Sequence, residues 1–403
     1  MSVSNPMSPK QFAAIAAIAL CMATFALYWP GLGGGFMLDD FPNIVDNAAL
    51  QINRLAWADW LAAMFSSPAS DLQRPLAMLS FAINTYFTGM DPVAMKLTSI
   101  GVHAFNGVLV FLLVSRLLAL GVPAASQARR RWTSVFIAAA WTFHPIQVTA
   151  VLYVVQRMES LCHTFVFLGL LLYLAGRTRQ IAGQPGWGRV LTGLVVCAAI
   201  GILSKESAAL LPLYAFLIEA CVLRFATAHA RTRHRLWAVY GVVLILPAIA
   251  GGTWLLLHSL APGAYAGRDF TMGDRLLTEG RVLVDYLRWT VFPSLRAFGL
   301  YHDDYGISRG WLAPATTMAS WLFLVALAIE ASWENLRKGV IVEGRGTKTI
   351  KGGLEVDVGG IRGFMPISQI DLYRVENAEQ FVNQRLLCLV AEVNPEDRNL
   401  VVS

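Results

Sequence analysis

Long apolar runs recur along the chain up to about residue 331 and then stop. A run of about 20 mainly apolar residues is long enough to cross a bilayer as a helix. We count about eight such runs, at residues 11–30, 97–120, 132–151, 160–176, 188–204, 207–223, 236–258 and 312–331. The chain is 56% hydrophobic and only 14% charged, below the charge content of a typical soluble domain. Residues 1–331 are therefore expected to form a polytopic α-helical membrane protein.

The charges divide unevenly at the same point. Of 32 Lys and Arg and 26 Asp and Glu, 23 and 16 precede Ser332, whereas 9 and 10 follow it, so the two parts carry net charges of +7 and −1. Arginines gather in alternate connections between the apolar runs, at 116 and 129–131, at 177–189 and at 224–235. Cytoplasmic loops are enriched in Lys and Arg. The N-terminus and the segment after the last run are therefore expected in the cytoplasm, and the loop after the first run outside.

Ionisable residues concentrate near the expected outer ends of the runs, where they mark candidate functional sites. They are Asp39, Asp40, Arg74, His103, His144, Arg157, Glu159, Lys205 and Glu206. Such a set suits transfer from a lipid-phosphate donor, because a carboxylate takes the acceptor proton and cations stabilise the departing phosphate. Adjacent residues point in different directions, so one of Asp39 and Asp40 is expected to act and the other to support it.

Structural alternatives apply to these residues. The Asp39–Asp40 pair also fits a solvated turn. His103 and His144 also fit hydrogen bonding between packed helices, and Arg157 also fits a side chain that reaches from a helix end to the interface.

Five segments appear in order over residues 36–220: FMLDDFPNI, QRPLAMLSFAINTYFTGMDP, HAFNGVLVFLL, FHPIQVTAVLYVVQRMESL and SKESAALLPLYAFLIEA. This series resembles the GT-C membrane glycosyltransferases, specifically the transmembrane and tetratricopeptide-repeat-containing protein O-mannosyltransferases and their bacterial relatives. The resemblance implies an integral protein of the bacterial inner membrane that uses a polyprenyl-phosphate-sugar donor and a protein hydroxyl acceptor, with inversion.

The resemblance also implies roles for individual residues. Either Asp39 or Asp40 would be the general base. The donor would be bound by Arg74, His103, His144, Arg157, Glu159, Lys205 and Glu206. A divalent metal remains open. The family's later spans and repeats do not follow residue 331, so this transferase region is expected to be incomplete, and its activity is an open question.

The rest of the chain, residues 332–403, reads as a separate domain of five short strands: GVIVEGRGTKTI, GLEVDVGGI, RGFMPISQI, RLLCLVAEVN and NLVVS. Five strands in about 65 residues fit a small all-β OB-fold barrel. The segments IKGGLEVDVGGIRGFMPISQIDL and NPEDRNLVVS resemble the RNA-binding domain that is repeated in the largest protein of the small ribosomal subunit. In that family, strands two and three bind single-stranded RNA by stacking and basic contacts.

On this resemblance the RNA-binding residues are Lys351, Arg362, Phe364, Tyr373 and Arg398. Phe364 fits a barrel-core aromatic equally well. The net charge of −1 and the residues Leu354 and Pro366, which depart from the strongest RNA binders, also fit a domain that docks on the ribosome. Three functions are therefore open: a transferase fused to an RNA-binding domain, a membrane-tethered RNA- or ribosome-binding protein, and an accidental fusion of two gene fragments.

Overall fold

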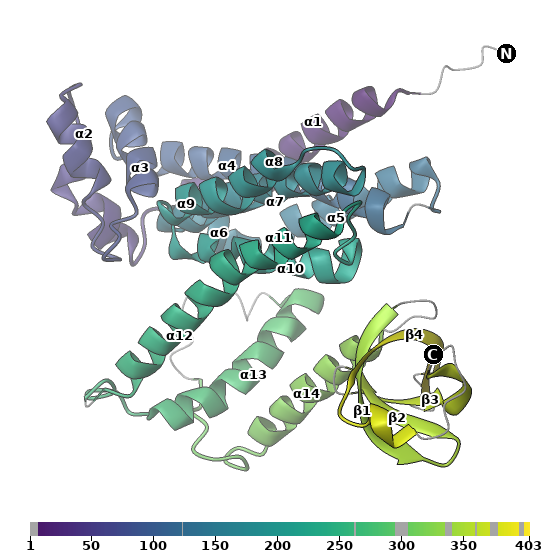
Figure 1. The fold of residues 1–403 in the computed structure, drawn as a ribbon. Helices are drawn as coiled ribbons and strands as arrows, with labels where there is room; N and C mark the ends of the chain where they lie inside the picture. Colours follow the sequence, from purple (N-terminus) through teal and green to yellow (C-terminus); the bar gives the residue numbers. More distant parts are fainter. Residues whose placement is uncertain are drawn as a thin grey trace. The chain divides into compact units, whose positions relative to one another are not determined.

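The computed structural model describes residues 7–122, 124–261, 263–294, 305–334, 341–358, 361–370, 378–394 and 399–403. The chain forms two compact units (Figure 1). One comprises Met1–Ala266 with Arg288–Tyr305, and the other Gly267–Leu287 with Gly306–Ser403. Each unit is described below by itself.

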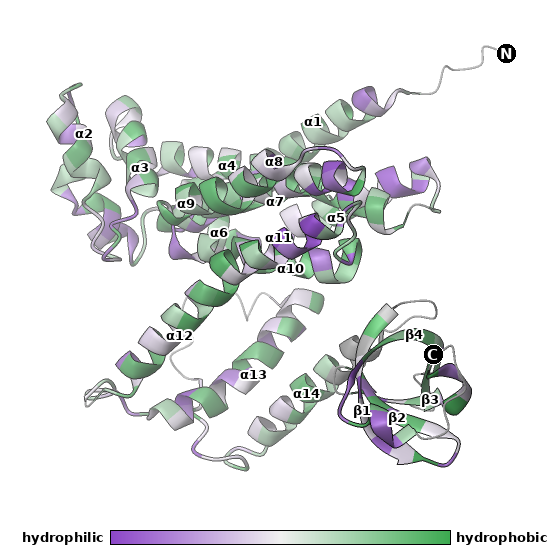
Figure 2. Ribbon diagram, in the orientation of Figure 1, coloured by the Kyte–Doolittle hydropathy of each residue, from purple (hydrophilic) through white to green (hydrophobic). Residues whose placement is uncertain are grey.

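Five helical segments in the described part of the chain are long and apolar enough to cross a membrane: Pro9–Gly33, Pro92–Gly121, Val154–Ile181, Glu206–Leu223 and Ala230–Ser259. They contain α1 (Pro9–Tyr28), α4 (Pro92–Gly121), α7 (Arg157–Ile181), α10 (Leu211–Ile218), α11 (Ala230–Tyr240) and α12 (Leu246–Ser259). Their apolar character is visible along the ribbon in Figure 2. The expectation of a polytopic α-helical membrane protein is thus confirmed.

Within the residues that the structure describes, long spans are fewer than the eight expected. Two of the expected runs form shorter apolar helices, Trp187–Ile202 and Thr316–Ala328. The continuous helix expected over residues 132–151 is wrong, because α5 (Gln127–Thr142) ends inside this range and a short α6 (Gln147–Leu152) begins after a turn. Pro145 lies in that turn, where its missing N–H and fixed φ interrupt helical hydrogen bonding.

In the first unit α1, α5 and α7 all pack against α4. The segment Trp187–Ile202 consists of α8 (Trp187–Leu191), the π-helical η5 (Thr192–Val196) and α9 (Cys197–Ile202), and it packs along α7. Gly169 and Gly193 make this approach possible, because a Cβ on Gly193 would lie 2.5 Å from the carbonyl oxygen of Gly169. Small residues commonly let membrane helices approach so closely.

Between α1 and α4 the chain forms a helical excursion with its own buried cluster. It contains η2 (Phe41–Val45), η3 (Ala48–Leu50), α2 (Trp57–Met64) and α3 (Pro75–Thr88). Ile44, Leu50 and Phe81 are fully buried and pack with Val154, just before α7, and with Met158 in its first turn. This cluster holds the loop that carries Asp39 and Asp40 against α7.

The second unit begins with α13 (Met272–Val291), whose residues from Arg288 onward belong to the first unit, and α14 (Thr316–Glu334). A capping box starts α13: the Asp274 N–H donates to Thr271 Oγ1 at 3.2 Å, and the Thr271 N–H donates to Asp274 Oδ2 at 2.9 Å. Gly280 of α13 lies directly against the Trp321 ring of α14.

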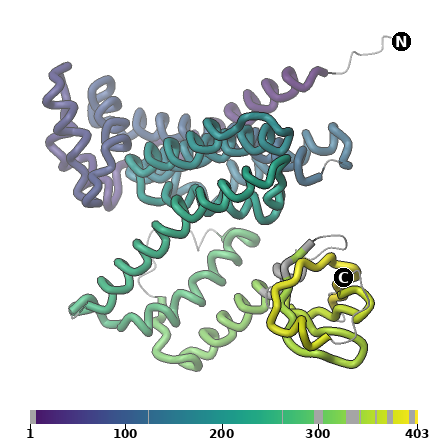
Figure 3. The backbone as a smooth tube through the Cα atoms, in the orientation of Figure 1, coloured from purple at the N-terminus to yellow at the C-terminus, as the bar shows by residue number. Residues whose placement is uncertain are grey.

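The five expected strands are all present. They are β1 (Ile341–Ile350), β2 (Gly353–Val358), β3 (Ile361–Pro366), β4 (Arg385–Asn394) and β5 (Asn399–Val402), with η10 (Ile367–Gln369) and η11 (Ala378–Phe381) between them. They close into a barrel in the order β1-β2-β3-β5-β4, and the tube in Figure 3 traces this closure. Leu354, Val356, Met365, Cys388 and Leu400 fill its interior. The OB-fold expectation is confirmed.

Candidate functional site

The candidate site is built around residues 153–159, where the 3-10 turn η4 (Val154–Gln156) leads into α7. These residues belong to the fourth motif segment, and the other four segments contact it at these positions or at the adjacent Ser160. The most direct are Asp39 and Asp40 from the first loop, Arg74 from the start of α3, and Lys205 from the start of the Glu206–Leu223 segment. Asn106 of α4 donates to the Ser160 carbonyl oxygen at 2.7 Å.

Asp40 is fully buried. Its carboxylate accepts the Val155 N–H at 2.7 Å and the Met37 N–H at 3.0 Å. Burial raises the pKa of Asp40, against the opposing effect of these N–H groups and of the nearby Lys96. Asp40 therefore ties the loop to the start of α7.

The neighbouring Asp39 has the opposite environment. Its backbone N–H donates to the Tyr153 hydroxyl at 2.7 Å, which fixes the main chain, while the residue is exposed. The two carboxylates therefore point to different surroundings, as expected for adjacent residues. Asp39 is the one that an incoming molecule could reach.

Lys96 is a site residue that our sequence analysis missed. It is 2% exposed, and its Nζ donates to the Gly34 carbonyl oxygen at 2.5 Å and to that of Gly31 at 3.3 Å. A cation near the start of the apolar run Pro92–Gly121 was the available signal, because such residues are costly in a membrane. Lys96 holds the glycine-rich stretch that precedes Asp39 and Asp40.

Arg74 and Glu206 form the first of two ion pairs at the site, with Nη2 and Oε2 2.9 Å apart. The Ser70 hydroxyl donates to the same carboxylate, and the Arg74 Nη1 lies 3.4 Å from the Met158 Sδ. Arg74 has a left-handed backbone with φ of 43°, as has Gln73 before it with φ of 54°. Non-glycine residues in this region are strained and often occur at functional sites. The pair lines an open polar recess of about 750 Å³.

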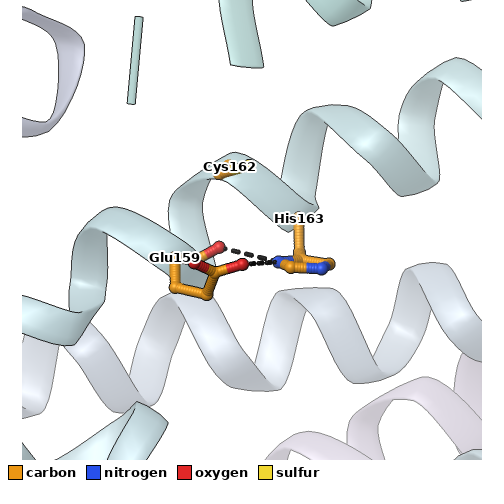
Figure 4. A group of neighbouring side chains, drawn as sticks. All are labelled: Glu159, Cys162 and His163. Carbon is orange, nitrogen blue, oxygen red and sulfur yellow. Dashed lines mark hydrogen bonds and ion pairs between the residues drawn. The ribbon is translucent and has the colours of Figure 1, made fainter. Parts of the chain in front are cut away.

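Lys205 and Glu159 form the second ion pair, with Nζ and Oε2 2.8 Å apart. Ser207 donates to the same oxygen at 3.1 Å. The other carboxylate oxygen lies 3.2 Å from the His163 Nδ1, and Figure 4 shows the two side chains facing each other. Both partners of the Lys205–Glu159 pair are about one-quarter exposed.

Glu159, Cys162 and His163 also form a possible metal-binding group, since one ligand atom from each lies within 4.8 Å of the others (Figure 4). The Lys205 ammonium, however, already contacts the Glu159 carboxylate. A cation bound there would have to displace that ammonium. The geometry therefore favours an ion-pair cluster over a metal centre.

The structure places three other expected donor-binding residues in structural contacts. Arg157 is fully buried, and its guanidinium donates to the Met95 carbonyl oxygen and the Asn84 Oδ1, both at 2.6 Å. His103 is buried, with Nε2 2.9 Å from the Thr142 carbonyl oxygen, and it lines a cavity of about 450 Å³ together with Glu159 and His163. His144 accepts the Ile146 N–H at Nδ1, which leaves Nε2 to donate to the Thr290 carbonyl oxygen.

In the barrel, Phe364 is half-buried on the outer face of β3, on the opposite side from the core residue Met365. Its ring lies over Gly353, where a Cβ would approach the ring to 2.9 Å. Arg362 is exposed on the same face, and Lys351 is exposed in the β1–β2 turn. Tyr373 and Arg398 lie outside the described residues. Phe364 is thus not part of the barrel core.

Comparisons with known proteins give one group of relatives for the barrel and another for the membrane part. Residues 335–403 match the family model of the S1 RNA binding domain. The small ribosomal subunit protein bS1 of Streptococcus pneumoniae is 38% identical over 79 residues, which are 19% of this chain and 20% of that protein.

The membrane part is similar to another group of proteins. Protein O-mannosyl-transferase TMTC3 of Mus musculus is 31% identical over 188 residues, 45% of this chain and 19% of that protein. Protein O-mannosyl-transferase Tmtc2 of Drosophila melanogaster is 29% identical over 195 residues, 47% of this chain and 20% of that protein. The chain spans about a fifth of the length of each of these relatives. It is an integral membrane protein whose N-terminal half is similar to TMTC protein O-mannosyl-transferases and whose C-terminal residues match the S1 RNA binding domain.

Proposed function

We propose that residues 1–331 form a GT-C-type glycosyltransferase region that moves a sugar from a polyprenyl-phosphate donor to a protein hydroxyl with inversion. The observation that carries the proposal is the convergence of four motif segments on residues 153–160 of the remaining one, FHPIQVTAVLYVVQRMESL. Similarity to protein O-mannosyl-transferases supports the same reaction class.

In this proposal Asp39 is the general base. Its carboxylate is exposed, whereas the Asp40 carboxylate is already engaged by two backbone N–H groups. Asp39 would accept the proton of the acceptor hydroxyl as that oxygen attacks the sugar's anomeric carbon. The bond from that carbon to the phosphate oxygen breaks on the opposite face, which inverts the configuration.

Arg74 and Lys205 are the candidate cations for the departing phosphate. Each is held by a glutamate, Glu206 and Glu159 respectively, and each pair is partly exposed. A phosphate that entered the recess beside Arg74 would gain hydrogen bonds whose strength grows as negative charge develops on the leaving oxygen. The glutamates would keep both cations oriented before the donor binds. Arg157, His103 and His144 would maintain the helix packing around them.

The barrel would serve a separate function. We place the domain boundary near Ser332 and propose that residues 333–403 bind single-stranded RNA, with Phe364 as a stacking platform between Arg362 and Lys351. The arginine distribution supports a bacterial inner-membrane protein whose N-terminus and barrel are cytoplasmic and whose Asp39 loop faces outward. Transfer and RNA binding would then occur on opposite sides of the membrane.

The test uses the full chain reconstituted in proteoliposomes with a radiolabelled polyprenyl-phosphate-mannose and a serine-containing peptide. Asp39→Asn should reduce the transfer rate by about a hundred- to ten-thousand-fold without lowering the melting temperature. Asp46→Asn is the matched control, because Asp46 is an exposed carboxylate of the same loop, and it should leave the rate unchanged.

Asp40→Asn, unlike Asp39→Asn, should lower the stability of the protein. It places an amide N–H against one of two backbone N–H groups, at a cost of about 1–3 kcal/mol in stability. A normal rate in Asp39→Asn would contradict the assignment of the base. Absence of transfer by the unaltered chain with every polyprenyl-phosphate-sugar tried would contradict the transferase proposal itself.

A further inference from the structure

An apolar groove of about 360 Å³ runs between α1 and α5. Both helices pack on α4, which supplies Val110 and Phe111 to the cluster beneath the groove. The groove exists because small side chains line its middle: Ala16, Ala19 and Ala23 on α1 and Ala139 on α5. It is almost wholly apolar, and it lies on an expected membrane-spanning segment, so hydrocarbon is the solvent around it.

Large side chains bound the groove at each end. At the start of the two helices the rings of Phe12 and Trp132 meet edge to face, with centroids 5.3 Å apart. At the other end the Tyr28 hydroxyl of α1 donates to the Thr142 carbonyl oxygen of α5 at 3.3 Å, which brings the two helices together.

The length of the groove matches one leaflet of a bilayer. From Phe12 to Ala23 the helix rises about 16 Å, at 1.5 Å per residue. Half of a hydrocarbon core of about 30 Å is about 15 Å. A helix that crossed the membrane would need a groove of twice this length, so the dimensions favour a lipid chain.

The charge beside the Phe12–Trp132 end of the groove selects the headgroup. The Arg131 guanidinium lies 5.6 Å from the centre of the Phe12 ring, and Arg129 is exposed one turn from Trp132. Lys10 is exposed in the first turn of α1, and neither α1 nor α5 has an acidic residue in its first turn. Tryptophan beside arginine at a helix start is typical of the headgroup level. The site is therefore cationic where a phosphate would lie.

We propose that this groove is a binding site for an anionic glycerophospholipid, with one acyl chain between α1 and α5 and the phosphate beside Arg131. An acyl chain gains no hydrophobic energy by leaving bulk lipid for the groove, so retention depends on close packing and on the phosphate contact. The packing of the acyl chain and the contact with the phosphate can each be altered by a separate substitution.

The experiment measures lipid retained by the full chain, purified in mild detergent, by native mass spectrometry after exposure to equal amounts of phosphatidylglycerol and phosphatidylcholine. The unaltered chain should keep one phosphatidylglycerol. Ala139→Phe, which fills the groove, should lower its occupancy at least ten-fold, whereas Ala140→Phe, exposed on the same helix and outside the groove lining, should not. Ala19→Phe and Ala14→Phe form the same matched pair on α1, should Ala139→Phe fail to fold.

The headgroup is tested by Arg131→Gln, with the exposed Arg233→Gln as a control of equal charge change. Arg131→Gln should lower the preference for phosphatidylglycerol about five-fold, the effect of about one basic residue at a membrane surface. Equal retention in the filled and control variants would overturn the proposal, as would equal preference in the two arginine variants. A dimer of the unaltered chain that dissociates in Ala139→Phe would overturn it too, because a second copy would then be the occupant.

Discussion

The two ends of α7 carry ion pairs of the same chemistry in different surroundings. Near its start, Glu159 pairs with Lys205 and Arg74 pairs with Glu206, and every partner retains some exposure. Near its end, Arg177 pairs with Glu219, with Nε and Oε1 2.6 Å apart and both side chains completely buried. The difference indicates which charges are available to a ligand.

The buried pair is saturated by neighbouring groups. Glu219 also accepts the Tyr173 hydroxyl at 2.5 Å, and that hydroxyl lies 2.7 Å from the hydroxyl of Tyr240. Arg177 donates further to the Gln180 Oε1 and the Ala226 carbonyl oxygen, both at 2.8 Å. Such a network joins α7 to η7 (Glu219–Leu223) and α11, and its members have structural roles. The partly exposed pairs are free to exchange partners.

The largest expected effect is on the buried pair. Arg177→Met leaves Glu219 buried without its cation and should lower the free energy of unfolding by about 3–5 kcal/mol, measured by thermal unfolding in detergent. The double variant Arg177→Met, Glu219→Leu removes both charges and should recover much of this loss. If Arg177→Met alone were as stable as the unaltered chain, the two ends of α7 would not differ as we describe.

Arg74→Gln should produce the converse result. Because the Arg74–Glu206 pair is partly exposed, we expect a stability loss of about 1 kcal/mol or less. Transfer should fall about a hundred-fold, the typical cost of losing one donor to a developing anion. Arg54→Gln is the control, since Arg54 forms an exposed pair with Asp59 in the same excursion. A large stability loss with an unchanged rate would make Arg74 a structural residue like Arg177.

The barrel offers the same contrast, between a buried structural residue and a partly exposed residue available to a ligand, for two apolar side chains. Phe364→Ala should weaken binding of single-stranded RNA by about ten-fold, since a stacked base contributes about 1–3 kcal/mol, while the melting temperature of the barrel changes little. Met365→Ala, one residue along on the core side, should instead destabilise the barrel by about 2–5 kcal/mol. Filter binding and thermal unfolding of the full chain separate the two outcomes. Equal RNA binding by Phe364→Ala and the unaltered chain would remove Phe364 from the proposed interface.

The smallest effect concerns the Asp274 carboxylate at the start of α13. Hydrogen bonds from Thr271 and the nearby Arg309 hold the pKa of Asp274 below its usual value. Its stabilisation of the α13 start is therefore present above the unfolded pKa of about 3.9 and is lost as pH falls through the lower folded value. Hydrogen exchange in the first turn of α13 should accelerate over that range relative to Asp274→Asn. An identical pH dependence in the two proteins would contradict this assignment.

Much of the fold could be predicted from periodicity and length. The five strands of the barrel alternate apolar and polar residues between turn residues, and five of the long apolar runs form helices long enough to cross a membrane. A continuous helix was expected over residues 132–151 because hydropathy alone does not indicate that Pro145 interrupts a helix. In the site, the expected topology put the ionisable residues of the motif segments near the same ends of the apolar runs. The sequence could not predict that Asp40 is buried while Asp39 is exposed. That difference depends on which backbone N–H groups lie within hydrogen-bond distance of each carboxylate in the folded protein.

The roles of Lys96 and Arg157 were also beyond sequence reasoning. Both are charged residues in apolar surroundings, a pattern that marks function and structure equally. Only the partners distinguish them: Arg157 bonds α3 and α4 residues such as Asn84 and Met95, and Lys96 bonds the glycine carbonyls before Asp39. For the barrel, alternation placed Phe364 on one face but could not say which face the closed sheet turns inward.

The hydrogen bond from the Val155 N–H to Asp40 has a consequence for synthesis. The two residues are 115 positions apart. At about 5–20 residues per second, a ribosome needs about 6–23 s to pass from one to the other. During that interval the nascent loop lacks both the Val155 N–H for Asp40 and the Tyr153 hydroxyl that fixes the Asp39 main chain, so the Asp39 carboxylate cannot yet be positioned. The site can therefore be completed only after η4 and the start of α7 have been synthesised and have reached the loop after α1.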